Sequence, residues 1–114
     1  MSNCIFCKII SKEIPSTIFY EDEACIAFDD INPQAPVHVL IVPKEHIATF
    51  NDLGEDKKDL IGRLGMVVTK IAEIKHIKDP GYRIVINCNT AGGQLVYHLH
   101  VHLLGGRHLS WPPG

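Results

Sequence analysis

His98-Leu99-His100-Val101-His102-Leu103 alternates polar and apolar residues without interruption. In an extended strand, side chains two positions apart lie on the same face of the sheet. The three histidines therefore share one face, with roughly 7 Å between successive Cα atoms. The two leucines and the valine point to the opposite face, where we expect them to pack against a helix.

Three imidazoles on one strand face leave three interpretations open. The face could be a plain solvent-exposed polar surface that happens to contain histidine. It could be a three-histidine metal site of the kind found in zinc hydrolases. It could also carry out imidazole chemistry on a phosphate, in which one ring attacks and its neighbours hold oxygens and a proton.

The rest of the chain predicts an α+β domain around this strand. Short β-prone runs cover residues 17–20, 24–28, 37–42 and 82–88, and the histidine strand covers 96–104. Residues 5–12 predict a short helix, and helical apolar spacing over 55–77 predicts a long one, with Asp52 and Glu55 at capping-box spacing. Short turns between strands favour antiparallel pairing, so residues 1–114 are expected to form one domain with the long helix on one sheet face.

Size and charge exclude several classes of protein. The chain has 114 residues and a formal net charge of -2, and it contains no run rich in lysine or arginine. We therefore expect no bulk nucleic-acid partner. The apolar runs are too short to span a bilayer, and the first residues do not have the pattern of a signal peptide. The expected location is the cytoplasm.

Four cysteines divide into two kinds. Disulfides are rare in a reducing compartment, so we expect none here. Cys25 and Cys88 lie in apolar runs and are expected to be buried as small hydrophobic residues. Cys4 and Cys7 form a C-x-x-C pair, which has the spacing of half a zinc site. The pair could also be redox-active, or simply two cysteines on one helix.

Motifs across the whole chain resemble the histidine triad superfamily of nucleotide hydrolases and transferases, and in particular its Hint branch. They are Ile5-Phe6, Ile14-Pro15, Phe28-x-Asp30-Ile31, Pro33-Gln34-Ala35-Pro36-x-His38, Val42-Pro43-Lys44-x-His46, Gly92-Gly93-Gln94, the triad with Leu103-Leu104, and Trp111-Pro112-Pro113-Gly114. The resemblance implies an antiparallel five-stranded sheet with one long and one short helix. It also implies a homodimer that merges two sheets into ten strands.

The resemblance implies an enzyme, a purine nucleoside phosphoramidase that hydrolyses P–N bonds such as that of AMP-lysine. In the family the middle histidine, here His100, attacks the α-phosphate and forms a covalent nucleotidyl-imidazole. His102 corresponds to the histidine that contacts the phosphate and leaving group, as an imidazolium. His98 and His38 complete the catalytic set, although His38 alone could be an ordinary strand histidine.

The same resemblance implies a nucleotide-binding set. Asp30 matches the residue that binds the ribose hydroxyls, although it could also be a turn aspartate. Apolar residues match the slot around the purine, although each could be plain core. The full set is Ile5, Phe6, Ile9, Phe28, Asp30, Ile31, Asn87, Gly93, Gln94, Leu95, His100, His102 and Trp111. Leu95 departs from the family pattern, because the Hint branch commonly has a phosphate-contacting serine there.

Bacterial members with an N-terminal C-x-x-C bind zinc through ligands that correspond here to Cys4, Cys7, His46 and His98. Four protein ligands leave no open coordination position, so the ion would be structural. No organic cofactor is expected.

The resemblance also implies that the C-terminal tail crosses to the partner subunit and brings Trp111 near the partner's active site. Two other functions stay open: a nucleotide-binding regulatory module with little turnover, and a zinc hydrolase that uses the three histidines as ligands.

Overall fold

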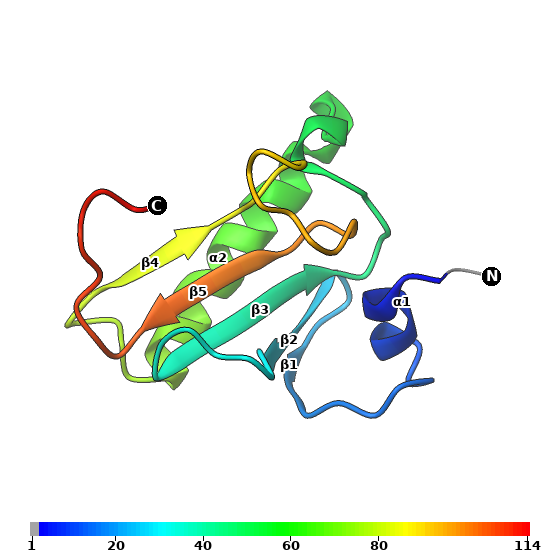
Figure 1. Ribbon diagram of the computed structural model, residues 1–114. Coiled ribbons are helices and arrows are strands. Elements are labelled where there is room, and N and C mark those ends of the chain that lie inside the picture. The colour runs from blue at the N-terminus through cyan, green and yellow to red at the C-terminus, as the bar shows by residue number, and fades with distance from the viewer. Residues whose placement is uncertain (1–2) are drawn as a thin grey trace.

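A five-stranded antiparallel sheet forms the centre of the computed structural model, which describes residues 3–114 (Figure 1). The strand order is β1-β2-β3-β5-β4. The bounds are Ile18–Glu21 for β1, Cys25–Asp29 for β2, Val37–Pro43 for β3, Tyr82–Val85 for β4 and Val101–Gly105 for β5. Every neighbouring pair is antiparallel, which confirms the predicted α+β fold.

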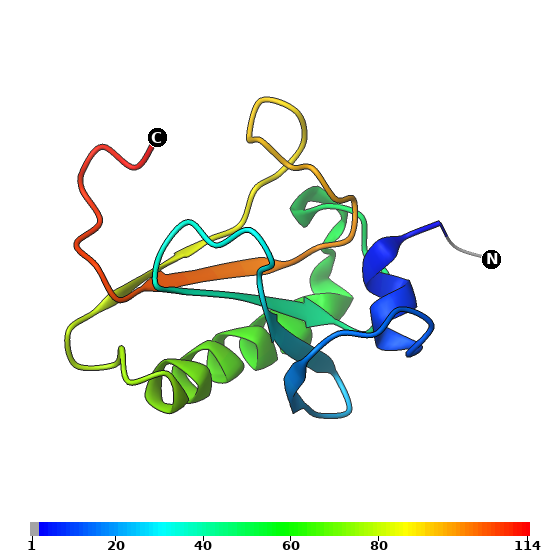
Figure 2. The ribbon, with the colours of Figure 1, turned by 60° about the horizontal axis from the view of Figure 1, so that its bottom comes forward.

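Two α-helices accompany the sheet, as predicted. The long helix α2, Lys58–Ile74, packs across one face, and the short helix α1, Ile5–Ile10, lies against the other side near one end of β3 (Figure 2). The loops that contain residues 30–36 and 86–100 also rise on the side opposite α2. This side therefore gathers the first helix, two loops and the histidines. No helix among residues 3–114 has both the length and the apolar content to span a membrane.

A separate apolar core covers each face of the sheet. Leu99, Val101 and Leu103 are at most 2% exposed and pack with the α2 residues, which confirms their predicted direction. The opposite face buries residues of α1, β2 and β3, namely Phe6, Ile9, Ile26, Phe28, Leu40 and Val42. Helix α1 therefore packs directly onto the histidine side of the sheet.

β1 and β2 form an antiparallel hairpin, and Asp22 explains the shape of its turn. One carboxylate oxygen of Asp22 accepts hydrogen bonds from the backbone amides of Ala24 and Cys25 at 2.7 and 2.8 Å. Such a local bond replaces the backbone partner that the turn removes.

The histidine strand is shorter than predicted, because regular pairing begins only at Val101. Upstream of that residue the chain finds other partners. The amide of Leu99 donates to the carbonyl of Ile47 at 2.6 Å, and the ring of His98 donates to the carbonyl of Pro43 at 2.8 Å. The alternation of faces persists through this extended segment, although it lies outside the regular ladder.

The long helix also differs at both ends from the predicted 55–77. A 3-10 turn at Glu55–Lys57 precedes it, and the capping box joins Thr49 to Asp52 on an earlier 3-10 turn rather than Asp52 to Glu55. At the other end, His76 adopts a left-handed conformation with φ 61°, which ends the helix after Ile74.

Candidate active site

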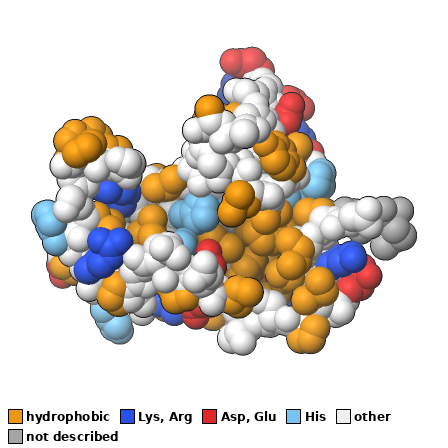
Figure 3. Space-filling view, viewed as in Figure 1, with side chains coloured by type: hydrophobic (Ala, Val, Ile, Leu, Met, Phe, Trp, Pro, Cys, Tyr) orange, Lys and Arg blue, Asp and Glu red, His pale blue; other side chains and the backbone are white. Residues whose placement is uncertain are grey.

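An open pocket of about 390 Å³ lies between α1 and the histidine face of the sheet. One wall is apolar and comes from α1 and its neighbours, with Ile5, Phe6, Ile9, Phe28 and Leu40. The other wall is polar and carries Asp30, Asn87, His100 and His102. On the corresponding surface, histidine and hydrophobic side chains adjoin in one hollow (Figure 3). The pocket is therefore suited to a ligand with an apolar ring at one end and an anion at the other.

Inside this pocket, His100 is 8% exposed and held by a short hydrogen bond. Its Nδ1 lies 2.7 Å from the carbonyl oxygen of His98, and a carbonyl can only accept, so Nδ1 carries the proton. The lone pair of a neutral ring is then on Nε2. Burial lowers the pKa of His100, which keeps the ring neutral at neutral pH. The ring therefore has the protonation state of a nucleophile.

A relay of polar groups sets the protonation of His102. The amide of Gln34 donates to Nδ1 of His38 at 3.0 Å, so the proton of a neutral His38 ring is on Nε2. This Nε2–H donates to Nδ1 of His102 at 3.0 Å. The carboxylate of Asp30 lies 3.5 Å from the same Nε2 of His38. The remaining proton of His102 is then on Nε2.

The imidazolium form of His102 is expected in the transition state, and the ligand-free protein holds the ring in its neutral form. Burial, followed by the neighbouring rings of His100 and His38, lowers the pKa of His102 to about 4. His102 is therefore neutral before a ligand binds. An anion in the pocket would raise this pKa and favour the charged ring.

The loop at residues 89–94 carries the Gly-Gly-Gln motif and folds back on itself. A Cβ on Gly92 would lie 2.5 Å from the carbonyl oxygen of Cys88, so only glycine fits there. Gly93 adopts φ 81° and lines the pocket. However, the amides of Gly93 and Gln94 donate to Thr90 and Asn89 within the loop. Both of these amides are thus engaged within the loop in the ligand-free protein.

Gln94 was predicted to bind nucleotide, but the structure places its side chain outside the pocket. It is 5% exposed, and its Nε2 donates to the carbonyls of Ala48 and Val96 at 2.8 and 3.0 Å. Its Oε1 accepts from the amide of Asn89 at 2.9 Å. Gln94 therefore anchors the loop.

The remaining predicted residues divide between the pocket and its surroundings. Ile31 and Leu95 line the mouth and are 100% and 91% exposed. His38 lies behind His102, and His98 belongs to a neighbouring cluster. Sequence reasoning missed the pocket residues Ile14, Pro15, Ser16, Leu40 and Val96. Ile14-Pro15 stands among the family motifs, and this was the signal that could have found those two.

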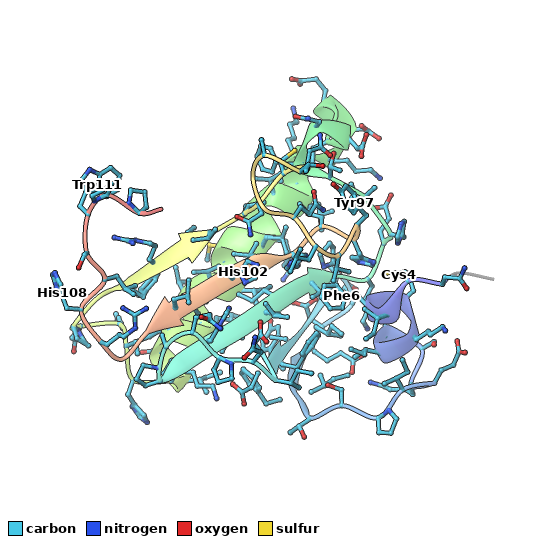
Figure 4. The ribbon with its side chains drawn as sticks, in the orientation of Figure 1. Cys4, Phe6, Tyr97, His102, His108 and Trp111 are labelled. Atoms are coloured by element: carbon cyan, nitrogen blue, oxygen red, sulfur yellow. The ribbon has the colours of Figure 1, made fainter. Side chains whose placement is uncertain are left out.

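Trp111 does not reach this chain's own pocket. It is 80% exposed and lies on the C-terminal tail, at the opposite end of the view from Phe6 and Cys4 (Figure 4). A role in a nucleotide site requires a second subunit.

A second cluster lies at the other end of the triad and contains Cys4, Cys7, His46 and His98. Nδ1 of His98 lies 3.3 Å from Cys4 Sγ, 3.6 Å from Cys7 Sγ and 3.1 Å from Nδ1 of His46, and Cys7 Sγ lies 3.3 Å from that His46 atom. Metal–ligand bonds of 2.0–2.3 Å give ligand separations of about 3.3–3.7 Å in a tetrahedral zinc site.

The protonation of His98 also fits a metal. Its Nε2–H donates to the carbonyl of Pro43 at 2.8 Å, which leaves the Nδ1 lone pair directed at the sulfur atoms. His98 is 0% exposed, so solvent does not compete with the cluster for that nitrogen. The donor set therefore fits a four-coordinate structural zinc ion, held by these four side chains.

A catalytic metal fits less well. The rings of the three triad histidines do not converge on one point, since His98 belongs to the cysteine cluster within residues 3–114. Asp30, His38 and His102 do converge, but Nδ1 of His38 accepts a backbone hydrogen bond and its Nε2 holds the proton. Metal binding there would require that bond to break.

This arrangement of sheet, pocket and histidines is that of a histidine triad protein. Residues 11–109 match the HIT domain family, so the chain belongs to that family.

Among proteins of known sequence, the chain is 52% identical over 106 residues to the purine nucleoside phosphoramidase of Escherichia coli, covering 93% of this chain and 89% of that protein. It is 54% identical to an uncharacterised HIT-like protein of Synechococcus elongatus, covering 96% of both chains.

Solved structures of HIT family proteins have the same fold. A HIT family hydrolase from Legionella pneumophila superposes with a TM-score of 0.96 at 52% identity, covering 98% of this chain and all of the other. A HIT family hydrolase from Clostridium thermocellum gives 0.93 at 52% identity, covering 96% of each chain.

Proposed function

We propose that this protein is a purine nucleoside phosphoramidase, a hydrolase of phosphorus–nitrogen bonds. The observation that carries the proposal is the unprotonated Nε2 of His100, fixed inside the pocket by the bond from its Nδ1–H to the His98 carbonyl. The activity named for the Escherichia coli relative supports the substrate class.

The proposed reaction has two steps. Nε2 of His100 attacks the α-phosphorus, the P–N bond breaks, and the leaving amine takes a proton from Nε2 of His102. The substrate's negative charge favours the imidazolium form of His102 that makes this transfer possible. In that form Nδ1 of His102 also carries a proton, so the Nε2–H of His38 would donate to the carboxylate of Asp30, 3.5 Å from it, in place of His102. Water then attacks the nucleotidyl-His100 and gives a proton to His102, which releases a nucleoside monophosphate and restores both rings.

The pocket walls assign parts of the substrate to parts of the site. The purine would lie against the apolar wall of Ile5, Phe6, Ile9, Phe28 and Ile31. The ribose hydroxyls would lie at Asp30, whose Oδ1 already accepts from the amide of Asn32 at 2.8 Å. Asn87, Gly93, Leu95 and the two catalytic histidines surround the remaining space for the phosphate and the amine. His38 supports His102.

Three further features complete the proposal. A structural zinc ion would bind Cys4, Cys7, His46 and His98 and tie α1 to the sheet. The protein would form a homodimer with a ten-stranded sheet and place Trp111 at the partner's site. Thiol ligands at Cys4 and Cys7 also favour the reducing cytoplasm as its location.

The deciding experiment is hydrolysis of adenosine 5′-phosphoramidate by the wild type and by His100→Ala, with AMP binding measured for both. We expect wild-type turnover, and a loss of at least about 10³-fold in the variant with AMP binding retained. AMP binding without wild-type turnover would instead support a regulatory nucleotide-binding module. The engaged loop amides and Leu95 are the features that favour this second function.

A further inference from the structure

The ring of Phe6 lies between two histidines that have different tasks. Its centroid is 5.0 Å from that of His100, with an interplanar angle of 85°, and 5.9 Å from that of His98, at 71°. Phe6 is 6% exposed. Both contacts are edge-to-face, one of the two arrangements that aromatic rings prefer. Phe6 therefore contacts the proposed nucleophile and a proposed metal ligand at once.

The His100 ring depends on such a neighbour for its direction. The hydrogen bond from Nδ1 to the His98 carbonyl fixes one nitrogen but leaves the ring able to tilt about that bond. Among residues 3–114, two aromatic rings contact His100 and limit this tilt: that of His102, with its centroid 4.9 Å away, and that of Phe6. Because an attack on phosphorus depends on alignment, a small tilt of Nε2 would lower the rate.

Phe6 is in turn placed by the cysteine cluster. It lies between Cys4 and Cys7 on α1, which has only six residues and is too short to be stable alone. Cys4 caps this helix by accepting from the amide of Cys7 at 3.4 Å. The Sγ of Cys4 lies 3.3 Å from Nδ1 of His98, and the Sγ of Cys7 lies 3.3 Å from Nδ1 of His46. The cluster therefore fixes the segment that carries Phe6.

We propose that Phe6 is a positioning residue for His100, and that the Cys4/Cys7/His46/His98 cluster sets its position through α1. Filling the cluster with metal would then align the nucleophile as well as stabilise the fold. The part of this inference that concerns rate rests on the proposed phosphoramidase function, and the part that concerns ring geometry does not.

Phe28 provides a control, because it is a buried phenylalanine of the same pocket that lies on β2, away from the cysteines, and its ring contact is with Phe6 rather than with His100 or His98. It is 5% exposed, lines the same pocket, and packs against the Phe6 ring at 5.8 Å. With adenosine 5′-phosphoramidate, Phe6→Leu should lower kcat about tenfold, a larger change than in KM. Phe28→Leu should act mainly on KM, and Phe6→Tyr, which keeps the ring, should restore kcat.

A second readout needs no substrate. In ¹⁵N spectra of the ligand-free protein, the His100 ring should show one form with Nδ1 protonated. Phe6→Leu should shift or broaden the Nε2 signal, whereas Phe28→Leu should leave it in place. If Phe6→Leu does not fold, Phe6→Met removes the ring at similar volume and is measured instead. A wild type without turnover would contradict the proposed function, while these spectra would still decide the role of Phe6.

The route from the cluster is tested by combining variants. Cys7→Ser should move the His100 signal in the same direction as Phe6→Leu, and should add little further change in the double variant, since both act through one ring. Additive changes would mean that the cluster acts through the His98 carbonyl and would overturn the role of α1. Unchanged His100 signals in Phe6→Leu, or an effect on KM alone, would overturn the positioning role.

Discussion

At the scale of single residues, backbone groups decide what each histidine can do. The carbonyl of Pro43 orients His98, the carbonyl of His98 orients His100, and the amide of Gln34 orients His38. Each bond fixes which ring nitrogen carries the proton. One face of four imidazoles is thereby divided into a metal ligand, a nucleophile and a proton relay.

The depressed pKa of His102 predicts a loss of stability in acid. The unfolded ring has a pKa of roughly 6.5, and the folded ring, which faces His100, His38 and Asp30, has one of about 4. Below pH 6.5 the unfolded chain binds a proton that the folded chain does not, so the free energy of unfolding falls as the pH drops from 6.5 towards 4. Denaturant melts across this range should show a shallower decline in His102→Asn. Equal slopes in both proteins would refute the prediction.

Leu95 at the pocket mouth predicts a gain of affinity on substitution. Leu95→Ser would supply a hydroxyl donor near the anion, where the amides of Gly93 and Gln94 are already engaged. We expect the Kd for AMP to fall about fivefold by calorimetry, in line with a net contribution of about 1 kcal/mol from one hydrogen bond. Because Leu95 is 91% exposed, stability should change by less than about 0.5 kcal/mol. Leu95→Ala is the control, and equal affinity of the alanine and serine variants would contradict the account.

At the scale of elements, local sequence patterns predicted the features that neighbouring residues determine, which are the faces of a strand and the presence of a helix. The alternation in residues 98–103 gave the correct faces, and the spacing of apolar residues such as Leu64, Val67 and Ile71 gave the long helix. The pattern did not predict where β5 begins, because the carbonyl of Ile47 takes the amide of Leu99 from a segment far away in sequence. It also misplaced the helix cap, since Asp52 bonds back to Thr49.

The candidate site shows the same division. The triad is visible as a motif, but the pocket wall contributed by Leu40 and Val96 is not, because an apolar strand residue has the same signature whether it lines a pocket or fills a core. Gln94 was assigned to the nucleotide site as part of the Gly-Gly-Gln motif, and a motif gives no side-chain direction. Its bonds to the distant carbonyl of Ala48 and to the neighbouring carbonyl of Val96 show that its side chain anchors the loop.

Helix α1 predicts a large loss of stability when its cluster is broken. Six residues cannot hold their own helix, so α1 depends on the packing of Phe6 and Ile9 and on the cluster that ties Cys4 and Cys7 to the sheet. We expect wild-type protein to contain one zinc ion per chain by elemental analysis. Cys4→Ser should lose it and lower Tm by more than about 8 °C.

Cys88→Ser is the matched control, because Cys88 lies outside the cluster. Its Tm should stay within about 2 °C of the wild type. Cys4→Ser protein with an unchanged Tm and no metal in either form would show that the cluster is not a zinc site.

At the scale of the whole molecule, one sheet edge is apolar and exposed. β4 is the terminal strand on that side, and its residues Ile84 and the following Ile86 are 49% and 36% exposed. Together with Phe50 and Cys88 they line a shallow apolar groove. An unprotected apolar edge strand favours pairing with another strand, which supports the proposed homodimer.

If β4 forms the dimer interface, a single positive charge placed on this strand should abolish the dimer. Ile84→Lys would bring two like charges together across a symmetric interface and should sediment as a monomer, whereas the wild type sediments as a dimer. Thr17→Lys, at the opposite edge beside β1, adds the same charge and should stay dimeric. A monomeric wild type would remove the basis for placing Trp111 at a partner's site.

The whole account depends on the Nε2 of His100 being the atom that bonds to phosphorus. The most direct measurement is to quench the protein during turnover of an adenosine phosphoramidate and locate the added mass by peptide mass spectrometry. We expect an adenylate on the peptide that contains residues 98–102, on His100 alone, and its absence in His100→Ala. An adenylate on His98 or His102, or turnover in which no adenylated histidine can be trapped while His100→Ala remains active, would contradict the account.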